Sequence, residues 1–210
     1  MPSSNIEMQQ VPFVNFPAQY IEERDEIHDC VERIFTQGNF VGGDEVSKLE
    51  DEIAKIIQTK HTIAVNSGTD ALVLSMKALD IGENDEVITT PNSFIASASA
   101  IVAVGAKPVF VDVKPDQNIN PDLVAEAITK NTKAIMPVHL TGRVAEMNCL
   151  KSLADNHGLF LIEDAAQSFG SQYKEKMSGS IGDVGCFSAH PLKNFNAAGD
   201  AGFITTNNKK

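Results

Sequence analysis

The chain has 210 residues, which is long enough for one large domain with a sizeable core. Its 28 acidic residues outnumber its 17 lysines and arginines, and the resulting net charge of −11 argues against nucleic acid or an anionic membrane as a partner. The three cysteines form no CxxC pair, so we expect neither a metal site nor a disulfide framework. No signal peptide or membrane span is visible, and we expect a cytoplasmic protein.

The N-terminal part of the chain predicts an arm followed by two helices. Residues 1–18 are polar and interrupted by proline, so we expect them to be extended. Apolar residues then recur on one helical face and stop near Gly38, and Asp44 is placed to cap a second helix. We expect residues 19–210 to form one large domain, and no finished second domain follows it.

From residue 61 onward, short apolar runs alternate with segments of helical character. The runs that predict strands are His61–Val65, Glu86–Thr90, Pro108–Val111, Ala134–Val138, Phe160–Ile162, Gly185–Ser188 and Phe203–Thr205. The segments that predict helices are Thr69–Leu79, Ser93–Val104, Pro121–Ile128 and Glu146–Asn156. This alternation predicts an α/β fold with a mostly parallel sheet covered on both faces, in which ligands bind at the carboxyl ends of the strands.

A small polar loop, Ser67-Gly68-Thr69, follows the first expected strand and opens a helix. Free backbone N–H groups and the positive end of the helix dipole would make this loop a phosphate site, and Gly68 would allow close approach. The loop has neither a Walker sequence nor a GxGxxG fingerprint, which argues against a dinucleotide-binding oxidoreductase. An ordinary helix cap is the alternative for this segment alone.

Other chemistry-bearing residues follow the second and fifth expected strands. Phe94 lies just past the second strand, where it could stack on a flat ligand or simply pack in the core. Glu163 and Asp164 close the fifth strand, and the two-residue period of a strand places them on opposite faces. One of the two carboxylates must therefore point toward the strand ends, where a buried charge needs a partner. A surface aspartate is the alternative.

Lys193 follows the sixth expected strand and precedes a loop of small residues. A partly desolvated lysine at such a place can lose its proton and react with an aldehyde, whereas a solvated surface lysine is the alternative. The combination of a phosphate loop, an aromatic ring, a carboxylate and a lysine at the ends of strands in one sheet suits pyridoxal 5′-phosphate. These groups would bind its phosphate, ring face, ring nitrogen and aldehyde.

The motifs resemble those of the DegT/DnrJ/EryC1/StrS family of sugar aminotransferases, which use pyridoxal phosphate and have the aspartate-aminotransferase fold (fold type I). The resemblance covers roughly residues 11–206, and it is highly specific for the family but weak for the substrate. The stretches that carry it are SGTDAL (67–72), GENDEVITTPNSFIASASAI (82–101), GAKPVFVDV (105–113), PVHLTG (137–142), LIEDAAQSFG (161–170) and GDVGCFSAHPLKN (182–194).

The resemblance implies roles for single residues. Lys193 matches the lysine that binds the cofactor aldehyde, Asp164 the carboxylate on the pyridine nitrogen, and Gln167 the residue near the phenolic oxygen. The remaining cofactor contacts that it implies are Phe94 on the ring, and Gly68, Thr69 and Ser188 on the phosphate. For His139 and His190, which also lie in family motifs, we expect structural hydrogen bonds and assign no catalytic step.

The implied reaction is transfer of an amino group, with glutamate as donor, to a nucleotide-activated keto sugar for polysaccharide or amino-sugar biosynthesis. A dehydratase of the same family would carry histidine in place of Lys193. The loop at 199–202 reads GDAG where the family usually has GDGG or GEGG, so we expect local strain at Ala201.

Family members are nearly twice as long as this chain and work as homodimers, with a C-terminal small domain that helps to bind substrate. We expect the large domain to be incomplete here and the small domain to be absent. A catalytically incompetent fragment and a non-catalytic regulatory protein that binds pyridoxal phosphate are therefore alternatives to an active enzyme.

Overall fold

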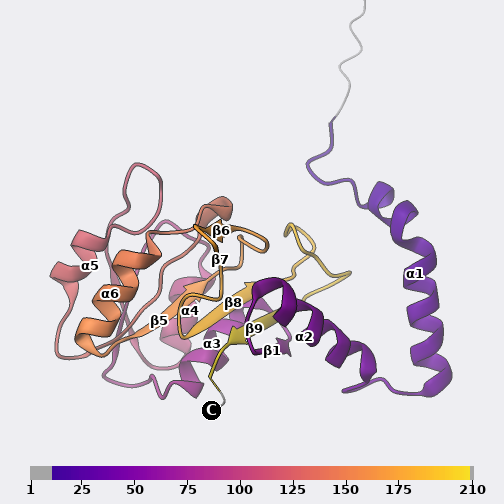
Figure 1. Ribbon diagram of the computed structural model, residues 1–210, viewed down its shortest axis with the longest axis horizontal. Coiled ribbons are helices and arrows are strands. Elements are labelled where there is room, and N and C mark those ends of the chain that lie inside the picture. Colours follow the sequence, from indigo (N-terminus) through magenta and orange to yellow (C-terminus); the bar gives the residue numbers. More distant parts are fainter. Residues whose placement is uncertain (1–10, 209–210) are drawn as a thin grey trace, which may run out of the picture. The chain divides into compact units, whose positions relative to one another are not determined.

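The computed structural model describes residues 11–208, and Figure 1 shows their helices and strands. The chain divides into two compact units, one that ends at Asp44 and one that begins at Glu45. Within residues 11–208, no helix is both long enough and apolar enough to cross a lipid bilayer.

The first unit consists mainly of the long helix α1 (Phe16–Gln37). The side chain of Asn15 caps it by accepting a hydrogen bond from the Ala18 amide at 3.3 Å, and Gly38 ends it in the left-handed conformation, with a φ of 70°. The helix therefore begins inside the segment that we expect to be an extended arm. Residues 1–10 of that arm lie outside the described residues.

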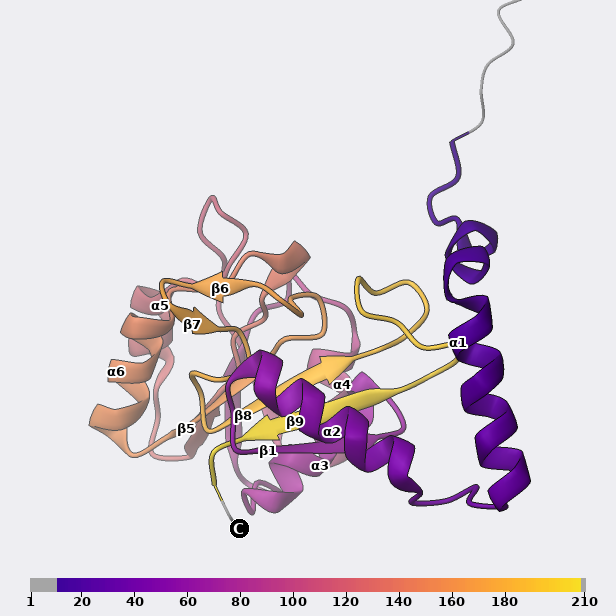
Figure 2. The ribbon, with the colours of Figure 1, turned by 45° about the vertical axis from the view of Figure 1, so that its right-hand side comes forward.

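The second unit is built around a seven-stranded sheet, in which the order is β1-β9-β8-β5-β4-β2-β3. The strands are β1 (His61–Val65), β2 (Glu86–Thr89), β3 (Lys107–Phe110), β4 (Thr132–Ile135), β5 (Phe160–Asp164), β8 (Val184–Ser188) and β9 (Gly202–Thr206). Figure 2 shows β8, β9 and β1 side by side. All seven expected strands form, with small shifts in their bounds, and the α/β fold with a mostly parallel sheet is confirmed.

One strand runs against the other six. β9 pairs antiparallel with β1 and with β8, whereas the remaining neighbours in the sheet pair in parallel. β9 follows β8 through a loop with no crossover helix, and a parallel neighbour would need such a crossover. Because β9 lies between β1 and β8, these two strands point the same way. The carboxyl ends of β1, β2, β5 and β8 therefore meet at one edge of the sheet.

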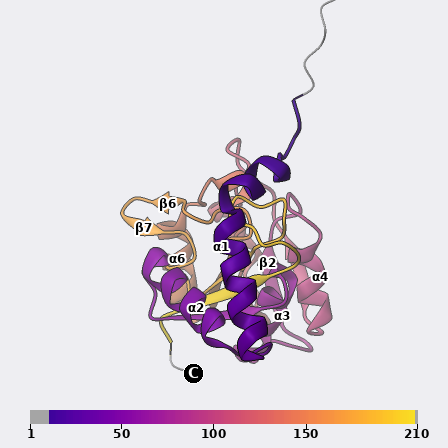
Figure 3. The ribbon, with the colours of Figure 1, turned by 90° about the vertical axis from the view of Figure 1, so that its right-hand side faces the viewer.

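Helices cover both faces of this sheet, which gives the three expected layers. The helices are α2 (Asp44–Ile57), α3 (Gly68–Ala78), α4 (Ala96–Ala103), α5 (Pro121–Ala127) and α6 (Met147–His157). Ile162 of β5 packs in the cluster of α3 and α4, and its neighbour Leu161 packs in the cluster of α5 and α6, as strand alternation requires. Figure 3 shows α3 and α4 on one side of the strands and α2 and α6 on the other.

Two local features differ from the sequence-based expectation. The helix expected from Ser93 begins at Ala96, because the preceding residues form a turn, and Phe94 therefore lies outside the helix. A hairpin of β6 (Gln172–Tyr173) and β7 (Lys176–Met177) was not expected, since strands of two residues carry no readable period.

The Glu163 carboxylate of β5 is fully buried and accepts four hydrogen bonds. The donors are the amides of Gly179, Ile181 and Gly182, at 2.8, 2.7 and 2.6 Å, and the ring Nε2 of His139, at 2.9 Å. The other ring nitrogen of His139 accepts from the Ala145 amide at 3.3 Å, so the ring is a neutral tautomer with its proton on Nε2. This network joins the segments after β4 and β7 to the end of β5.

We predict that Glu163→Gln lowers the free energy of unfolding by about 3 kcal/mol, because the new amide group would face N–H donors in a buried site. Urea unfolding monitored by circular dichroism would measure the change. The matched control is Glu175→Gln in the exposed β6–β7 turn, which should stay within about 0.5 kcal/mol of wild type. A loss below about 1 kcal/mol in Glu163→Gln would show that the network contributes little.

Candidate active site

A cleft of about 630 Å³ opens where the carboxyl ends of β1, β2, β5 and β8 meet. Parallel strands place the residues that follow them at one edge of a sheet, and this is where we expect a ligand to bind. The cleft brings together all seven residues that the sequence singles out for the cofactor. These are Gly68, Thr69, Phe94, Asp164, Gln167, Ser188 and Lys193.

One wall of the cleft is the N-terminus of α3. The side chain of Ser67 accepts from the Asp70 amide at 3.1 Å, whereas the amides of Gly68 and Thr69, in the first turn, have no carbonyl within the helix to bind. Ser188 lies against this turn, and a Cβ on Gly68 would sit only 2.6 Å from the Ser188 Cβ. The glycine is therefore required by close packing, and the free amides lie beside a hydroxyl group.

The start of β9 closes the same wall. A Cβ on Gly202 would lie 2.4 Å from the carbonyl carbon of Ser67, so only glycine fits there. The expectation of backbone strain at Ala201 is wrong, because Ala201 does not have a positive φ. The residue of this loop that has a positive φ is Gly199, with a φ of 155°. Alanine is therefore tolerated at this position without backbone strain.

The Asp164 carboxylate lies at the base of the cleft, and only 5% of the residue's surface is exposed. Its Oδ2 accepts from the Ser97 hydroxyl at 2.6 Å, and its Oδ1 accepts from the Ala166 amide at 3.2 Å. Burial raises the pKa of Asp164 above its usual range, and the donated hydrogen bonds act in the opposite direction. Asp164 is thus the carboxylate on the cleft side of β5, whereas Glu163 faces the other side.

Lys193 lines the cleft from the loop after β8, and the two residues that follow it in the sequence hold that loop against Phe169. The Phe195 ring stacks on Phe169, with 4.4 Å between ring centroids, and the Asn194 side chain donates to the Phe169 carbonyl at 2.8 Å. The Lys193 amide also donates to the His190 carbonyl at 2.8 Å. The segment that follows Asp164 at the end of β5 therefore also fixes the backbone beside the lysine.

Phe94 and Gln167 are the remaining two of the seven expected cofactor residues in the cleft. The Phe94 side chain is 68% exposed, so it is not the core residue that the alternative interpretation required. The Gln167 Oε1 accepts from the Thr141 amide at 3.0 Å, which orients the amide nitrogen of Gln167 the other way. Thr141 has a φ of 53° in the short helix η1 (Leu140–Gly142), a conformation that is unfavourable for a β-branched residue.

The two histidines of the motifs differ in position. His139 is fully buried in the Glu163 network and does not line the cleft. His190 lines the cleft, and its Nδ1 accepts from the Leu192 amide at 3.1 Å. Ser97 and Phe195 were missed from the sequence, because a serine in a small-residue helix and an aromatic residue in a loop carry no local signal of these contacts.

These groups fit the cofactor that the motifs imply. Free amides with a neighbouring hydroxyl suit a phosphate, a buried carboxylate suits a cationic ring nitrogen, and an exposed aromatic ring suits a flat ligand. Within the part of the chain that the structure describes, no three His, Cys, Asp or Glu side chains are grouped to hold a metal ion.

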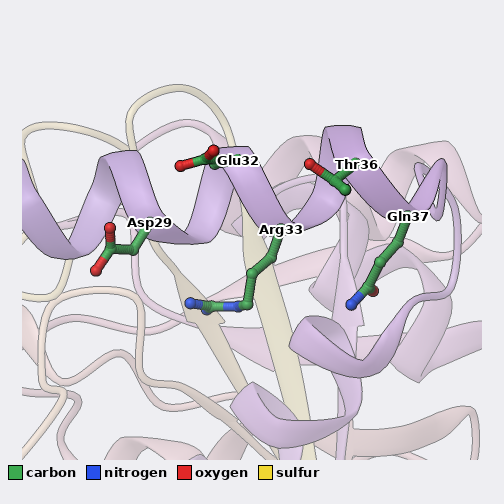
Figure 4. Close-up of a pocket in the computed structure, with 5 residues that line it drawn as sticks. All are labelled: Asp29, Glu32, Arg33, Thr36 and Gln37. Atoms are coloured by element: carbon green, nitrogen blue, oxygen red, sulfur yellow. The ribbon is translucent and has the colours of Figure 1, made fainter.

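A second hollow lies on α1 in the first unit (Figure 4). Its residues are Asp29, Glu32, Arg33, Thr36 and Gln37. The lining mixes acidic, basic and neutral side chains of one exposed helix, and it contains none of the residues that the motifs single out. The strand-end cleft is therefore the candidate active site.

Comparison with curated proteins identifies several close relatives. A dTDP-3-amino-3,4,6-trideoxy-alpha-D-glucose transaminase of Streptomyces venezuelae is 42% identical over 97% of this chain and 54% of its own length. A UDP-N-acetyl-3-dehydro-alpha-D-glucosamine 3-aminotransferase of Acidithiobacillus ferrooxidans is 45% identical over 93% and 53%. A "pleiotropic regulatory protein" of Geobacillus stearothermophilus is 43% identical over 94% and 53%. The chain thus spans about half the length of the curated relatives it matches.

Solved structures agree with this fold. DesV from S. venezuelae superposes with a TM-score of 0.93 at 41% identity, covering 96% of this chain and 55% of DesV. NtdA from Bacillus subtilis, solved with bound pyridoxamine phosphate, gives a TM-score of 0.89 at 35% identity, over 98% and 47%. These similarities confirm the expected fold type I. The family profile matches residues 21–210, and the chain therefore belongs to the DegT/DnrJ/EryC1/StrS aminotransferase family.

Proposed function

We propose that this chain is the cofactor-binding part of a pyridoxal-phosphate-dependent aminotransferase that acts on a nucleotide-activated keto sugar. The observation that carries the proposal is the meeting of Lys193 and the buried Asp164 in one cleft, beside the free amides of α3. The names of relatives support the substrate class, since the Streptomyces and Acidithiobacillus proteins are dTDP- and UDP-sugar aminotransferases.

Lys193 is the reactive group in this proposal. Its Nζ would hold the cofactor aldehyde covalently, with loss of water, and once released the same nitrogen would act as the base at the α-carbon of the amino donor. The position of Lys193 suits this role, because it is partly buried and lines the same cleft as Asp164. Bound pyridoxal phosphate supplies an electron sink for the carbanion that this proton removal creates.

The other cleft residues bind and orient the cofactor. Asp164 keeps the ring nitrogen protonated through a charge-assisted hydrogen bond, and Phe94 covers the ring. Gln167 donates from its amide nitrogen toward the phenolic oxygen. The amides of Gly68 and Thr69, together with the Ser188 hydroxyl, bind the phosphate.

The proposal extends to the amino donor and to the assembly. We take glutamate as the donor and a homodimer as the working state, which the family resemblance implies. Polysaccharide or amino-sugar biosynthesis is the proposed setting, and a spore coat polysaccharide biosynthesis protein of Bacillus subtilis, 42% identical to this chain, supports it.

A non-catalytic regulatory role is the second candidate, because one relative is named a pleiotropic regulatory protein. The two candidates differ in their need for a nucleophile. A protein that only responds to the cofactor requires its binding but not proton transfer by Lys193. The presence of the lysine in the cleft favours the enzyme.

We predict that borohydride reduction of the chain in the presence of pyridoxal phosphate attaches the cofactor to Lys193. Peptide mass spectrometry would locate the label, and Lys193→Ala should remove it, since no other side chain can replace a lysine amine at this place in the cleft. Lys174→Ala, in the exposed β6–β7 turn, is the matched control and should keep the full label. A label on Lys174 or Lys176, or one that survives Lys193→Ala, would refute the assignment.

A further inference from the structure

Two serine hydroxyls connect the cleft to the buried carboxylate of Asp164. The Ser97 Oγ donates to Asp164 Oδ2 at 2.6 Å, and the Oγ atoms of Ser93 and Ser97 lie 2.6 Å apart. Ser97 is only 2% exposed, on α4, whereas Ser93 precedes this helix and lines the cleft. Three polar groups from the segment after β2 and from the end of β5 thus form a continuous chain.

The direction of this chain follows from the number of protons available. A hydroxyl has one hydrogen, and Ser97 uses it toward the carboxylate of Asp164, which can only accept while it is ionised. Ser93 must therefore donate to Ser97, and its remaining lone pairs are available to the cleft. The arrangement suits ionised Asp164, because Ser97 then donates to Oδ2 and Ser93 donates to Ser97, whereas protonation of Oδ2 would require both hydroxyls to turn their hydrogens the other way.

The other groups around Asp164 do not replace Ser97 as a hydrogen-bond donor to its Oδ2. Lys193 faces Asp164 from the cleft, and it belongs to the reactive machinery. The His139 ring is held in the Glu163 network described above, and its Nε2 faces the Glu163 carboxylate instead of Asp164.

On the β8 side, the buried Cys186 thiol has a pKa raised to about 12 by desolvation and remains neutral at physiological pH. The Glu163 carboxylate lies on the opposite face of β5 and turns its oxygens toward its own donors. Ser97 and the Ala166 amide are the two groups that donate hydrogen bonds to the Asp164 carboxylate among residues 11–208.

We propose that Ser97 is a positioning residue that holds Asp164 ionised and orients its Oδ2, with Ser93 aligning the Ser97 hydroxyl. The inference rests on the proposed function in one respect, which is that Asp164 is the partner of the cofactor's ring nitrogen. Its physical content concerns the apoprotein: a hydrogen bond to a buried anion stabilises the charged form and opposes the cost of burial.

The test is the titration of Asp164 by carboxyl ¹³C NMR in the apoprotein, together with the dissociation constant for pyridoxal phosphate. In Ser97→Ala the midpoint should move to higher pH, because the ionised form loses its donor. Affinity at neutral pH should fall about tenfold or more, the loss expected when a hydrogen bond to a charged group is removed. Ser97→Thr, which keeps the hydroxyl, should restore both values, and Ser93→Ala should shift the midpoint less in the same direction.

Ser99→Ala is the matched control, because the hydroxyl of this exposed serine on α4 donates to the Ala96 carbonyl and its loss should leave both values unchanged. An unshifted Asp164 midpoint in Ser97→Ala, or an equal shift in Ser99→Ala, would overturn the proposal. If Ser97→Ala fails to fold, Ser97→Cys replaces it, and its weaker donor should again raise the midpoint. Should the chain not bind pyridoxal phosphate, the proposed function fails, while the apoprotein titration still decides the role of Ser97.

Discussion

The burial of one negative charge, on Asp164, is the constraint around which this site is organised. A desolvated carboxylate is costly unless donors and a cationic partner compensate it, and this carboxylate has only two hydrogen-bond donors, Ser97 and the Ala166 amide, among residues 11–208. Its neighbour Glu163 is equally buried but fully satisfied by four donors. The contrast distinguishes a carboxylate that the fold itself satisfies from one that, in our proposal, also binds a cationic ligand, although both belong to one strand.

The topology of the sheet then determines what else can reach Asp164. Six strands share a direction, so the residues after β1, β2, β5 and β8 converge on one edge of the sheet. Close packing of Gly68 against Ser188 sets the distance between the helix N-terminus and β8, and the stacking of Phe195 on Phe169 fixes the backbone beside the lysine. The N-terminus of α3, the carboxylate and the lysine are therefore positioned by packing within the second unit.

The seven strands of the main sheet and the residues that line the cleft at their ends could be predicted from the sequence, because apolar strands bounded by polar loops and helix caps leave local signals. The directions of β1 and β9 could not be predicted, since an apolar run has no direction and only pairing reveals it. The short β6–β7 hairpin has no period, and the role of Ser97 depends on a contact between residues 67 positions apart. The prediction of strain at Ala201 was wrong for a similar reason, because the φ angle of one residue depends on the conformation of the whole loop.

The central claim is that Asp164 keeps the ring nitrogen of bound pyridoxal phosphate protonated. ¹⁵N NMR of the full chain with cofactor labelled at the ring nitrogen tests it directly, because the chemical shift reports whether that nitrogen carries a proton. We expect a protonated nitrogen in the wild-type chain and an unprotonated one in Asp164→Asn, which keeps the shape of the side chain and removes its charge. An unprotonated nitrogen in the wild type, or the same shift in both proteins, would contradict the account.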